Sequence, residues 1–278
     1  MAFKDFLLPL VGDPGPATVV AIDRCVAMAA DIGARLTAIA IEVESGPTLL
    51  MSTELAFADT LEKTRSFSNV HEMLSVFESA SLRLGALNKQ AIRKVSPEDI
   101  SAFLSGCARL TDLTIFPMKT HNGQCQDIVE QLIFGSGRPV LLCPEETAAT
   151  LGTTFDTIAI AWDNTGPVAR AIADAMPLLQ AAASVHIFTV IDSETPAEGD
   201  SGAALASHLA MHGVAASFET VKRGGASVGK VFEAVVKAKA ADLLVMGAYR
   251  HSRMNEWIWG GASNTIIAHP PCWVLMSH

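Results

Sequence analysis

Short apolar runs alternate with longer amphipathic stretches along the chain. In the second half, glycine, proline or polar residues bound each apolar run, and a stretch with helical spacing follows it. This alternation predicts βαβ units and a parallel sheet, and the continuous apolar runs indicate strands buried on both faces. The expected strands are 157–162, 185–191, 216–222, 243–246 and 273–276, and the expected helices are 168–182, 203–212, 224–238 and 258–269.

The first half repeats this order about 140 residues earlier. Its expected strands are 6–11, 36–43, 90–95, 113–116 and 139–143, and its expected helices are 16–32, 53–84, 97–108 and 126–134. The segment 111–117 (TDLTIFP) aligns with 241–247 (ADLLVMG). We therefore predict two domains of one type, at 1–146 and 153–278.

The composition of the chain argues against several classes of protein. The chain has 278 residues, half of them hydrophobic, and a formal net charge of −9, which argues against sequence-independent nucleic-acid binding. No apolar run reaches the ~18 residues of a membrane span, and the N-terminus lacks the features of a signal peptide. Five scattered cysteines without a C-x-x-C motif indicate reduced thiols, with Cys125 expected in an exposed polar loop. We expect a cytoplasmic protein with neither a nucleic-acid nor a membrane partner.

The end of the chain combines a strand, a glycine and a helix start rich in small residues. The strand ends at Gly247, and Gly260, Gly261 and Ser263 open the final expected helix. Backbone N–H groups at a helix start hold phosphate, and glycine lets a backbone approach a ligand closely. This pattern predicts a phosphate-binding loop.

These residues resemble the loop of the universal stress protein family, and the whole chain resembles its tandem, UspA-like members. The family's loop runs glycine, two residues, glycine, nine residues, glycine, then serine or threonine. Gly247 and Gly260 match the first and third glycines, Arg250 replaces the second, and Gly261 stands at the hydroxyl position. The resemblance is strongest over 241–278.

The resemblance implies an α/β fold of two tandem doubly wound parallel-sheet domains, adenine nucleotide alpha-hydrolase-like, each with strand order 3-2-1-4-5. It also implies that the two fifth strands pair, so that the halves form a pseudo-dimer. Family members often associate through these strands. Two options stay open: a homodimer, or a chain whose fusion already satisfies that edge.

The resemblance further implies that the second half binds ATP or a related adenine nucleotide, with Mg²⁺. Asp163 would hold the adenine or ribose side, and Val190 would line the base pocket. The other implied ligand-binding residues are Met246, Gly247, Arg250, Gly260, Gly261, Ala262 and Ser263. Arg250 leaves two hypotheses open: its guanidinium pairs with a phosphate, or it fills the pocket.

The first half departs from the family pattern. Val11 lies opposite Asp163, with Asp13 nearby, and Pro117 replaces Gly247. Proline lacks both the N–H and the permissive φ of glycine, and the loop after it is four residues shorter. We expect no nucleotide binding of the family type in this half.

Two further patterns have simpler interpretations. Residues 224–230 (GGASVGK) fit G-x-x-x-x-G-K, but Val231 stands where a P-loop has serine or threonine, so we expect a glycine turn. His208 and His212 have a metal-binding spacing on a helix, but no third ligand is evident, so we expect surface or capping roles.

The pattern contains no acid/base pair, metal cluster or activated nucleophile. We therefore expect a non-catalytic regulator or sensor in the stress response, with ATP or another adenine nucleotide bound in its second half. The alternatives are a nucleotide-free protein-interaction module and a slow ATP hydrolase.

Overall fold

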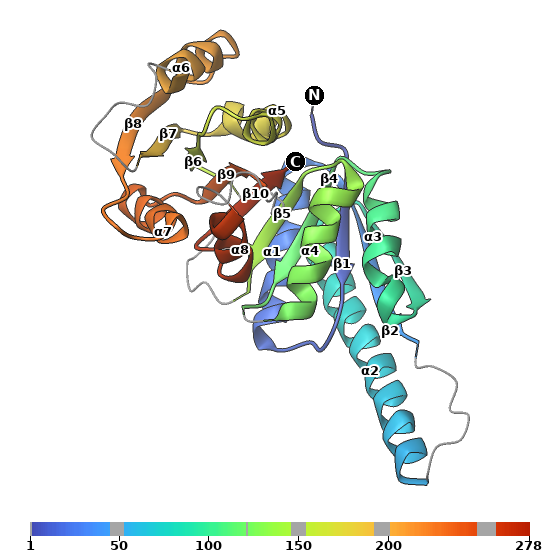
Figure 1. Ribbon diagram of the computed structural model, residues 1–278. Coiled ribbons are helices and arrows are strands. Elements are labelled where there is room, and N and C mark those ends of the chain that lie inside the picture. The colour runs from blue at the N-terminus through green and yellow to red at the C-terminus, as the bar shows by residue number, and fades with distance from the viewer. Residues whose placement is uncertain (1, 45–52, 121, 146–153, 192–200, 249–259) are drawn as a thin grey trace.

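The computed structural model describes residues 2–44, 53–120, 122–145, 154–191, 201–248 and 260–278. Ten strands form one continuous sheet in the order β3-β2-β1-β4-β5-β10-β9-β6-β7-β8 (Figure 1). Each half therefore has the strand order 3-2-1-4-5, as predicted.

The N-terminal half supplies the first five strands. They are β1 (Asp5–Leu10), β2 (Arg35–Val43), β3 (Asn88–Val95), β4 (Leu113–Met118) and β5 (Val140–Pro144). Its helices are α1 (Pro16–Ile32), α2 (Thr53–Leu84), α3 (Ile100–Ala108) and α4 (Gly123–Ser136), and a 3₁₀ turn (Pro97–Asp99) precedes α3.

The C-terminal half repeats the arrangement. Its strands are β6 (Thr157–Ala161), β7 (Ser184–Ile191), β8 (Ala216–Lys222), β9 (Leu243–Gly247) and β10 (Trp273–Ser277). Its helices are α5 (Gly166–Ala181), α6 (Ser201–Met211), α7 (Val228–Lys239) and α8 (Gly260–Ala268).

The two halves meet where β5 pairs with β10 (Figure 1). This pair is antiparallel, whereas the other strand pairs recorded in the sheet are parallel. The fifth strands thus pair within the chain, as the resemblance implied. The domain boundaries at 146 and 153 stay a prediction, because the sheet and the packing on it continue across the seam.

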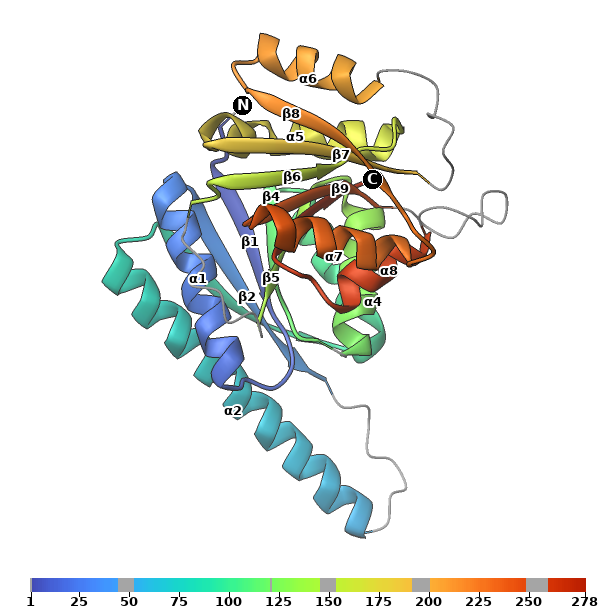
Figure 2. The ribbon, with the colours of Figure 1, turned by 90° about the vertical axis from the view of Figure 1, so that its left-hand side faces the viewer.

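Helices cover both faces of the sheet (Figure 2). Buried residues of α1, α2, α5 and α6 form one hydrophobic layer, and those of α3, α4, α7 and α8 form the other. The central strands are apolar on both faces because each face contacts a helix layer. This explains why their sequences lack the polar alternation of a half-exposed strand.

Most predicted elements are confirmed within two residues, with α1, α2 and β8 matching at both ends. The prediction for α4 was too short. The Asn122 side chain accepts a hydrogen bond from the Cys125 N–H at 3.1 Å and so caps the helix. The helix therefore begins at Gly123 instead of at residue 126. The expected exposure of Cys125 is wrong for the same reason, since its side chain is buried in the first turn.

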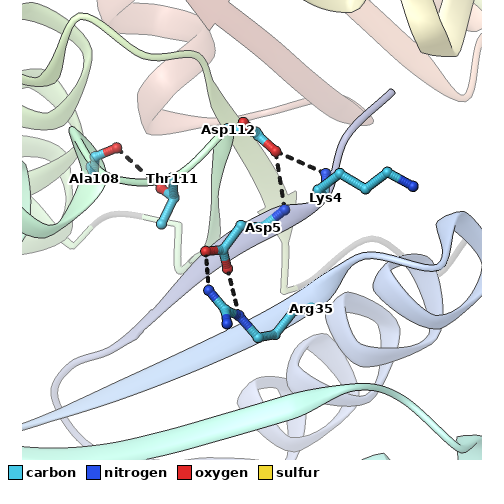
Figure 3. A network of polar contacts seen from close by, with 6 residues as sticks. All are labelled: Lys4, Asp5, Arg35, Ala108, Thr111 and Asp112. Atoms are coloured by element: carbon cyan, nitrogen blue, oxygen red, sulfur yellow. Dashed lines mark hydrogen bonds and ion pairs between the residues drawn. The ribbon is translucent and has the colours of Figure 1, made fainter. Parts of the chain in front are cut away.

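One aspartate in each half fastens the start of the first strand to the fourth, and Figure 3 shows the one in the N-terminal half, Asp112. The Asp112 carboxylate accepts from the N–H groups of Lys4 (2.8 Å) and Asp5 (3.0 Å). Asp242 accepts from the N–H of Thr157 at 2.9 Å. The segments 111–117 and 241–247 therefore share both a sequence pattern and the hydrogen bonding of their aspartate to the first strand of their half.

The largest difference between the halves is in α2. This helix has 32 residues, against 11 in α6, and its N-terminal end projects beyond the rest of the molecule (Figures 1 and 2). No helix among the described residues combines the length and apolarity needed to cross a membrane.

Replacing Asp112 by alanine removes the acceptor of two main-chain N–H groups. We expect the free energy of unfolding to fall by about 1–3 kcal/mol, measured by urea unfolding. Asp112→Asn keeps one acceptor oxygen and should recover part of the loss. The exposed Glu78→Ala should stay within about 0.5 kcal/mol of the original protein. Equal stability of the Asp112→Ala and Glu78→Ala variants would refute the fastening role.

Candidate functional site

The predicted site lies where β6 and β9 end. These strands are neighbours in the sheet, and Ala161 pairs with Met246. Asp163 and Gly247 therefore lie close together at the carboxyl ends of the two strands. β7 flanks β6 on the other side, which brings the half-buried Val190 to the same edge. Ligands of open α/β sheets bind at this kind of edge, where the strand order reverses.

Asp163 holds Thr165, the N-cap residue of the helix that follows, in place. Its Oδ1 accepts from the Thr165 N–H at 3.1 Å and from the Thr165 hydroxyl at 2.6 Å. Asn164 between them has a φ of +59°, which turns the chain sharply into α5. The aspartate thus has a structural role that the sequence alone did not indicate.

Gly247 is required by packing. A Cβ at this position would lie 2.6 Å from the Val168 nitrogen and 3.0 Å from Pro167. The start of α5 therefore packs directly on the glycine. The neighbouring Met246 points to the opposite face, where its side chain is 1% exposed in the layer under α7 and α8. Met246 could therefore contact a ligand at the strand end only through its main-chain atoms.

The start of α8 lies at the same edge. α8 leads into β10, which is parallel to β9, so the helix runs back from the carboxyl ends of the strands. Its first turn carries Gly260 to Ser263, with the side chains of Ala262 and Ser263 buried and open space beside Gly261. Arg250 lies outside the described residues.

The glycine turn at 224–230 has the geometry of a helix start. Gly224 and Gly225 have φ of +60° and +80°, and the Ser227 hydroxyl accepts from the Lys230 N–H at 3.4 Å to cap α7. The rings of His208 and His212 contact each other edge to face, with centroids 4.9 Å apart. Within the described residues, no group of three metal-ligating side chains is found.

A second edge site, which the sequence did not predict, lies in the first half. We call it the N-terminal cleft. It has a volume of about 460 Å³ and opens between the carboxyl ends of β1 and β4, with Val11, Asp13 and Pro117 in its lining. Phe6 pairs with Leu113 as Ile158 pairs with Leu243, so the strand register agrees with the predicted equivalence of Val11 and Asp163.

One wall of the N-terminal cleft joins the β1–α1 loop to α2. The Asp13 carboxylate forms a salt bridge with Arg65 and accepts from the Asn69 amide, both on α2. Ser66, on the same helix, accepts from the Val43 N–H at 3.1 Å. These contacts hold the middle of α2 against the strand ends.

The opposite wall carries a buried carboxylate and the start of α4. Glu145 is 8% exposed, and its Oε2 accepts from the Thr18 hydroxyl at 3.1 Å. Burial raises the pKa of the Cys125 thiol to about 11, and the nearby Glu145 charge adds to the rise, whereas Lys119 opposes it. Cys125 is therefore protonated at neutral pH and is no nucleophile.

A third hollow lies between α5 and α6. It has a volume of about 650 Å³ and is lined by Trp162, Ile172, Met176, Leu205 and His208, among others. In the first half, α2 packs directly against α1, the helix that corresponds to α5.

The fold is a duplicated, doubly wound α/β architecture. Residues 154–278 match the sequence profile described as "Universal stress protein family". The C-terminal half is therefore similar to this family, and the N-terminal half has the same strand order. No curated protein matches the chain.

Solved structures of similar length support the fold across the whole chain. A universal stress protein from Archaeoglobus fulgidus DSM 4304 is 14% identical, with a TM-score of 0.69 over 99% of this chain and 96% of that one. A functionally unknown protein from Pseudomonas aeruginosa PAO1 is 14% identical, with a TM-score of 0.60 over 99% and 92%. At these identities the similarity concerns the fold alone.

Alanine substitution distinguishes a glycine that is required by close packing from a glycine with open space beside it. Gly247→Ala forces a Cβ against the backbone of α5, and we expect a loss of about 1–3 kcal/mol of stability. Gly261→Ala adds a methyl group to open space in a helix, and we expect no loss or a gain of up to about 1 kcal/mol. Thermal unfolding of both variants measures the difference. Equal melting temperatures would show that α5 can move off Gly247.

Proposed function

We propose that this chain is a non-catalytic regulator or sensor that binds an adenine nucleotide, ATP or a relative of it, at the carboxyl edge of its C-terminal half. The match of residues 154–278 to the universal stress protein family supports this proposal.

The observation that carries the proposal is the convergence of three features at one edge. Asp163 follows β6 and Gly247 ends the adjacent β9, and the first turn of α8 begins at the same edge of the sheet. Helix-start N–H groups bind phosphate, and a carboxylate accepts from ribose hydroxyls. A carboxylate has acceptor capacity on both oxygens, so the α5 cap on Oδ1 is compatible with a ligand.

We also propose that binding is not followed by catalysis. Eight of the nine predicted site residues are described, and Asp163 is the only one of the eight with a titratable side chain. Its carboxylate is engaged in the α5 cap. Hydrolysis would require a positioned base or metal beyond this set.

A specific observation favours a second candidate, a nucleotide-free interaction module. The two most diagnostic residues, Asp163 and Gly247, each have a structural explanation in the capping and packing of α5. A chain that had lost its ligand would retain both residues for folding alone. The choice between the two candidates is therefore experimental.

Calorimetric titration of the purified chain with ATP, with and without Mg²⁺, tests the proposal. We expect saturable binding that Asp163→Ala weakens about tenfold, equal to ~1.4 kcal/mol. Thr165→Ala is the matched control, because it disturbs the same cap but keeps the carboxylate. The nucleotide-free candidate predicts no heat of binding from any of these proteins.

Arg250→Gly restores the family's second loop glycine and decides between the two hypotheses for Arg250. If the guanidinium pairs with a phosphate, the variant should bind ATP about tenfold more weakly, since a charge-assisted contact is lost. If the side chain fills the pocket, the variant should bind ATP more tightly. The same titration measures both, and an unchanged affinity would exclude Arg250 from the site.

A further inference from the structure

The hollow between α5 and α6 follows from where these two helices are anchored on the sheet. α5 packs on β9 and β10, whereas α6 packs on β7 and β8. β6 lies between these two pairs in the strand order, so the helices stand apart above it (Figure 1). We call this space the α5–α6 hollow.

Close packing at the edge of the sheet fixes the position of α6. Gly202 in its first turn lies on the Phe218 ring of β8, where an added Cβ would be 2.0 Å from Cε2. Leu209, further along the helix, is fully buried in the hydrophobic layer beneath it. α6 would lose these contacts if it moved toward α5, so the hollow is part of the packed fold.

Two hydrogen bonds close the ends of the α5–α6 hollow. At the carboxyl edge of the sheet, the Trp162 indole N–H donates to the Ser201 hydroxyl at 3.1 Å. At the other end, the Gln180 amide of α5 donates to the His212 carbonyl at 3.0 Å. All four residues belong to the lining. The hollow is therefore a bounded space and not an open helix surface.

Small side chains leave the space between these two ends. Ala169 and Ala173 of α5 face the hollow, as does Ala204 of α6, and Ile172 and Leu205 add larger apolar groups. These residues lie three or four positions apart along each helix, so both helices line the hollow lengthwise. The middle of the hollow is thus apolar.

The hollow is long and narrow. Its lining runs from Ala169 to Gln180 on one side and from Ser201 to His212 on the other, which is roughly 16 Å at the rise of an α-helix. A volume of about 650 Å³ over this length is within the range of small-molecule sites. This shape favours an extended chain over a compact ring system.

The polar chemistry of the hollow differs between its ends. Among the described residues of its lining there is no Lys, Arg, Asp or Glu, and His208 and His212 lie at the end that Gln180 closes. An imidazole donates to an anion and takes up a proton in the physiological pH range. A ligand with several charges would bury them without partners. The hollow therefore suits an apolar chain with one anionic head.

We propose that the α5–α6 hollow binds a medium-chain fatty acid. The acyl chain lies along the three alanines and Ile172, and the carboxylate lies beside His208 and His212. This site is separate from the nucleotide site proposed at the strand ends, and it does not depend on nucleotide binding.

Three matched probes test the proposal on the full chain by calorimetry, each below its micelle-forming concentration. Decanoate has the chain and the carboxylate, hexanoate has the same head on a short chain, and 1-decanol has the same chain without charge. We expect decanoate to bind at least about tenfold more tightly than either of the others. Absence of decanoate binding, as expected if a protein segment covers the hollow, would overturn the proposal, and so would equal affinity for the three probes.

Filling the hollow should remove the ligand. Ala204 and Ala203 are neighbouring exposed alanines of α6, and Ala204 lines the hollow whereas Ala203 does not. Leucine is a good helix former, so both leucine variants should fold, which thermal unfolding checks. Ala204→Leu should bind decanoate at least about tenfold more weakly, and the matched control Ala203→Leu should bind it as the original chain does. An equal affinity in both variants would show that decanoate binds elsewhere.

The histidines locate the carboxylate. Replacing both His208 and His212 by glutamine should weaken decanoate about tenfold and leave 1-decanol unchanged. His71→Gln, at an exposed histidine of α2 in the other half, is the control and should change neither. An unchanged decanoate affinity in the double variant would refute the placement of the head. Displacement of decanoate by ATP would place it in the nucleotide site and overturn the proposal, whereas a chain that binds no ATP leaves every one of these measurements intact.

Discussion

The pairing of β5 with β10 is the interaction on which the rest of the structure depends. Both strands are buried along their whole length, so each would present an apolar, unpaired edge if its half stood alone. Trp273, 2% exposed, packs edge to face on Phe155 beside this seam, and Phe134 of α4 contacts the His278 ring across it. Pairing the two edges within one chain gives both hydrophobic layers their continuity.

The antiparallel sense of this pair also sets the geometry of the two candidate sites. Strands within each half are parallel, so the carboxyl ends of one half point opposite to those of the other. The N-terminal cleft and the edge that carries Asp163 therefore lie at opposite edges of the same sheet. Two ligands would not meet, and any coupling between them would pass through packed strands and helices.

Local periodicity was sufficient to predict the strands and helices, whereas the strand order and the pairing of the fifth strands were implied by the resemblance to a family. Buried strands such as β9 and amphipathic helices such as α1 are apolar at the positions that contact the core, and this pattern is readable without coordinates. Sites depend on other information. The sequence shows a glycine at position 247 whether the close neighbour is a ligand or α5. Only the structure shows that α5 is that neighbour, because a Cβ on Gly247 would lie 2.6 Å from the Val168 nitrogen.

The N-terminal cleft was missed for a related reason. Pro117 and the shorter connection predict only that nucleotide binding of the family type is absent, and they say nothing of a cleft. In the structure, α4 is capped by Asn122 and begins near the strand ends with Cys125 buried, and Asp13 links the β1–α1 loop to α2. The walls of the N-terminal cleft are placed by the helix caps and the loop lengths acting together. No single residue pattern in the sequence predicts that combined result.

The two halves thus share one fold but differ in the loops at their strand ends and in the length of their second helix. The C-terminal half keeps the strand-end glycine and the small residues at the start of α8, and its α6 is short. In the first half the long α2 is fixed at Asp13 by Arg65 and Asn69, so the helix that projects from the molecule also forms a wall of the cleft. The duplicated fold therefore provides two edges of similar position but different chemistry, and only the N-terminal one is joined directly to the projecting helix.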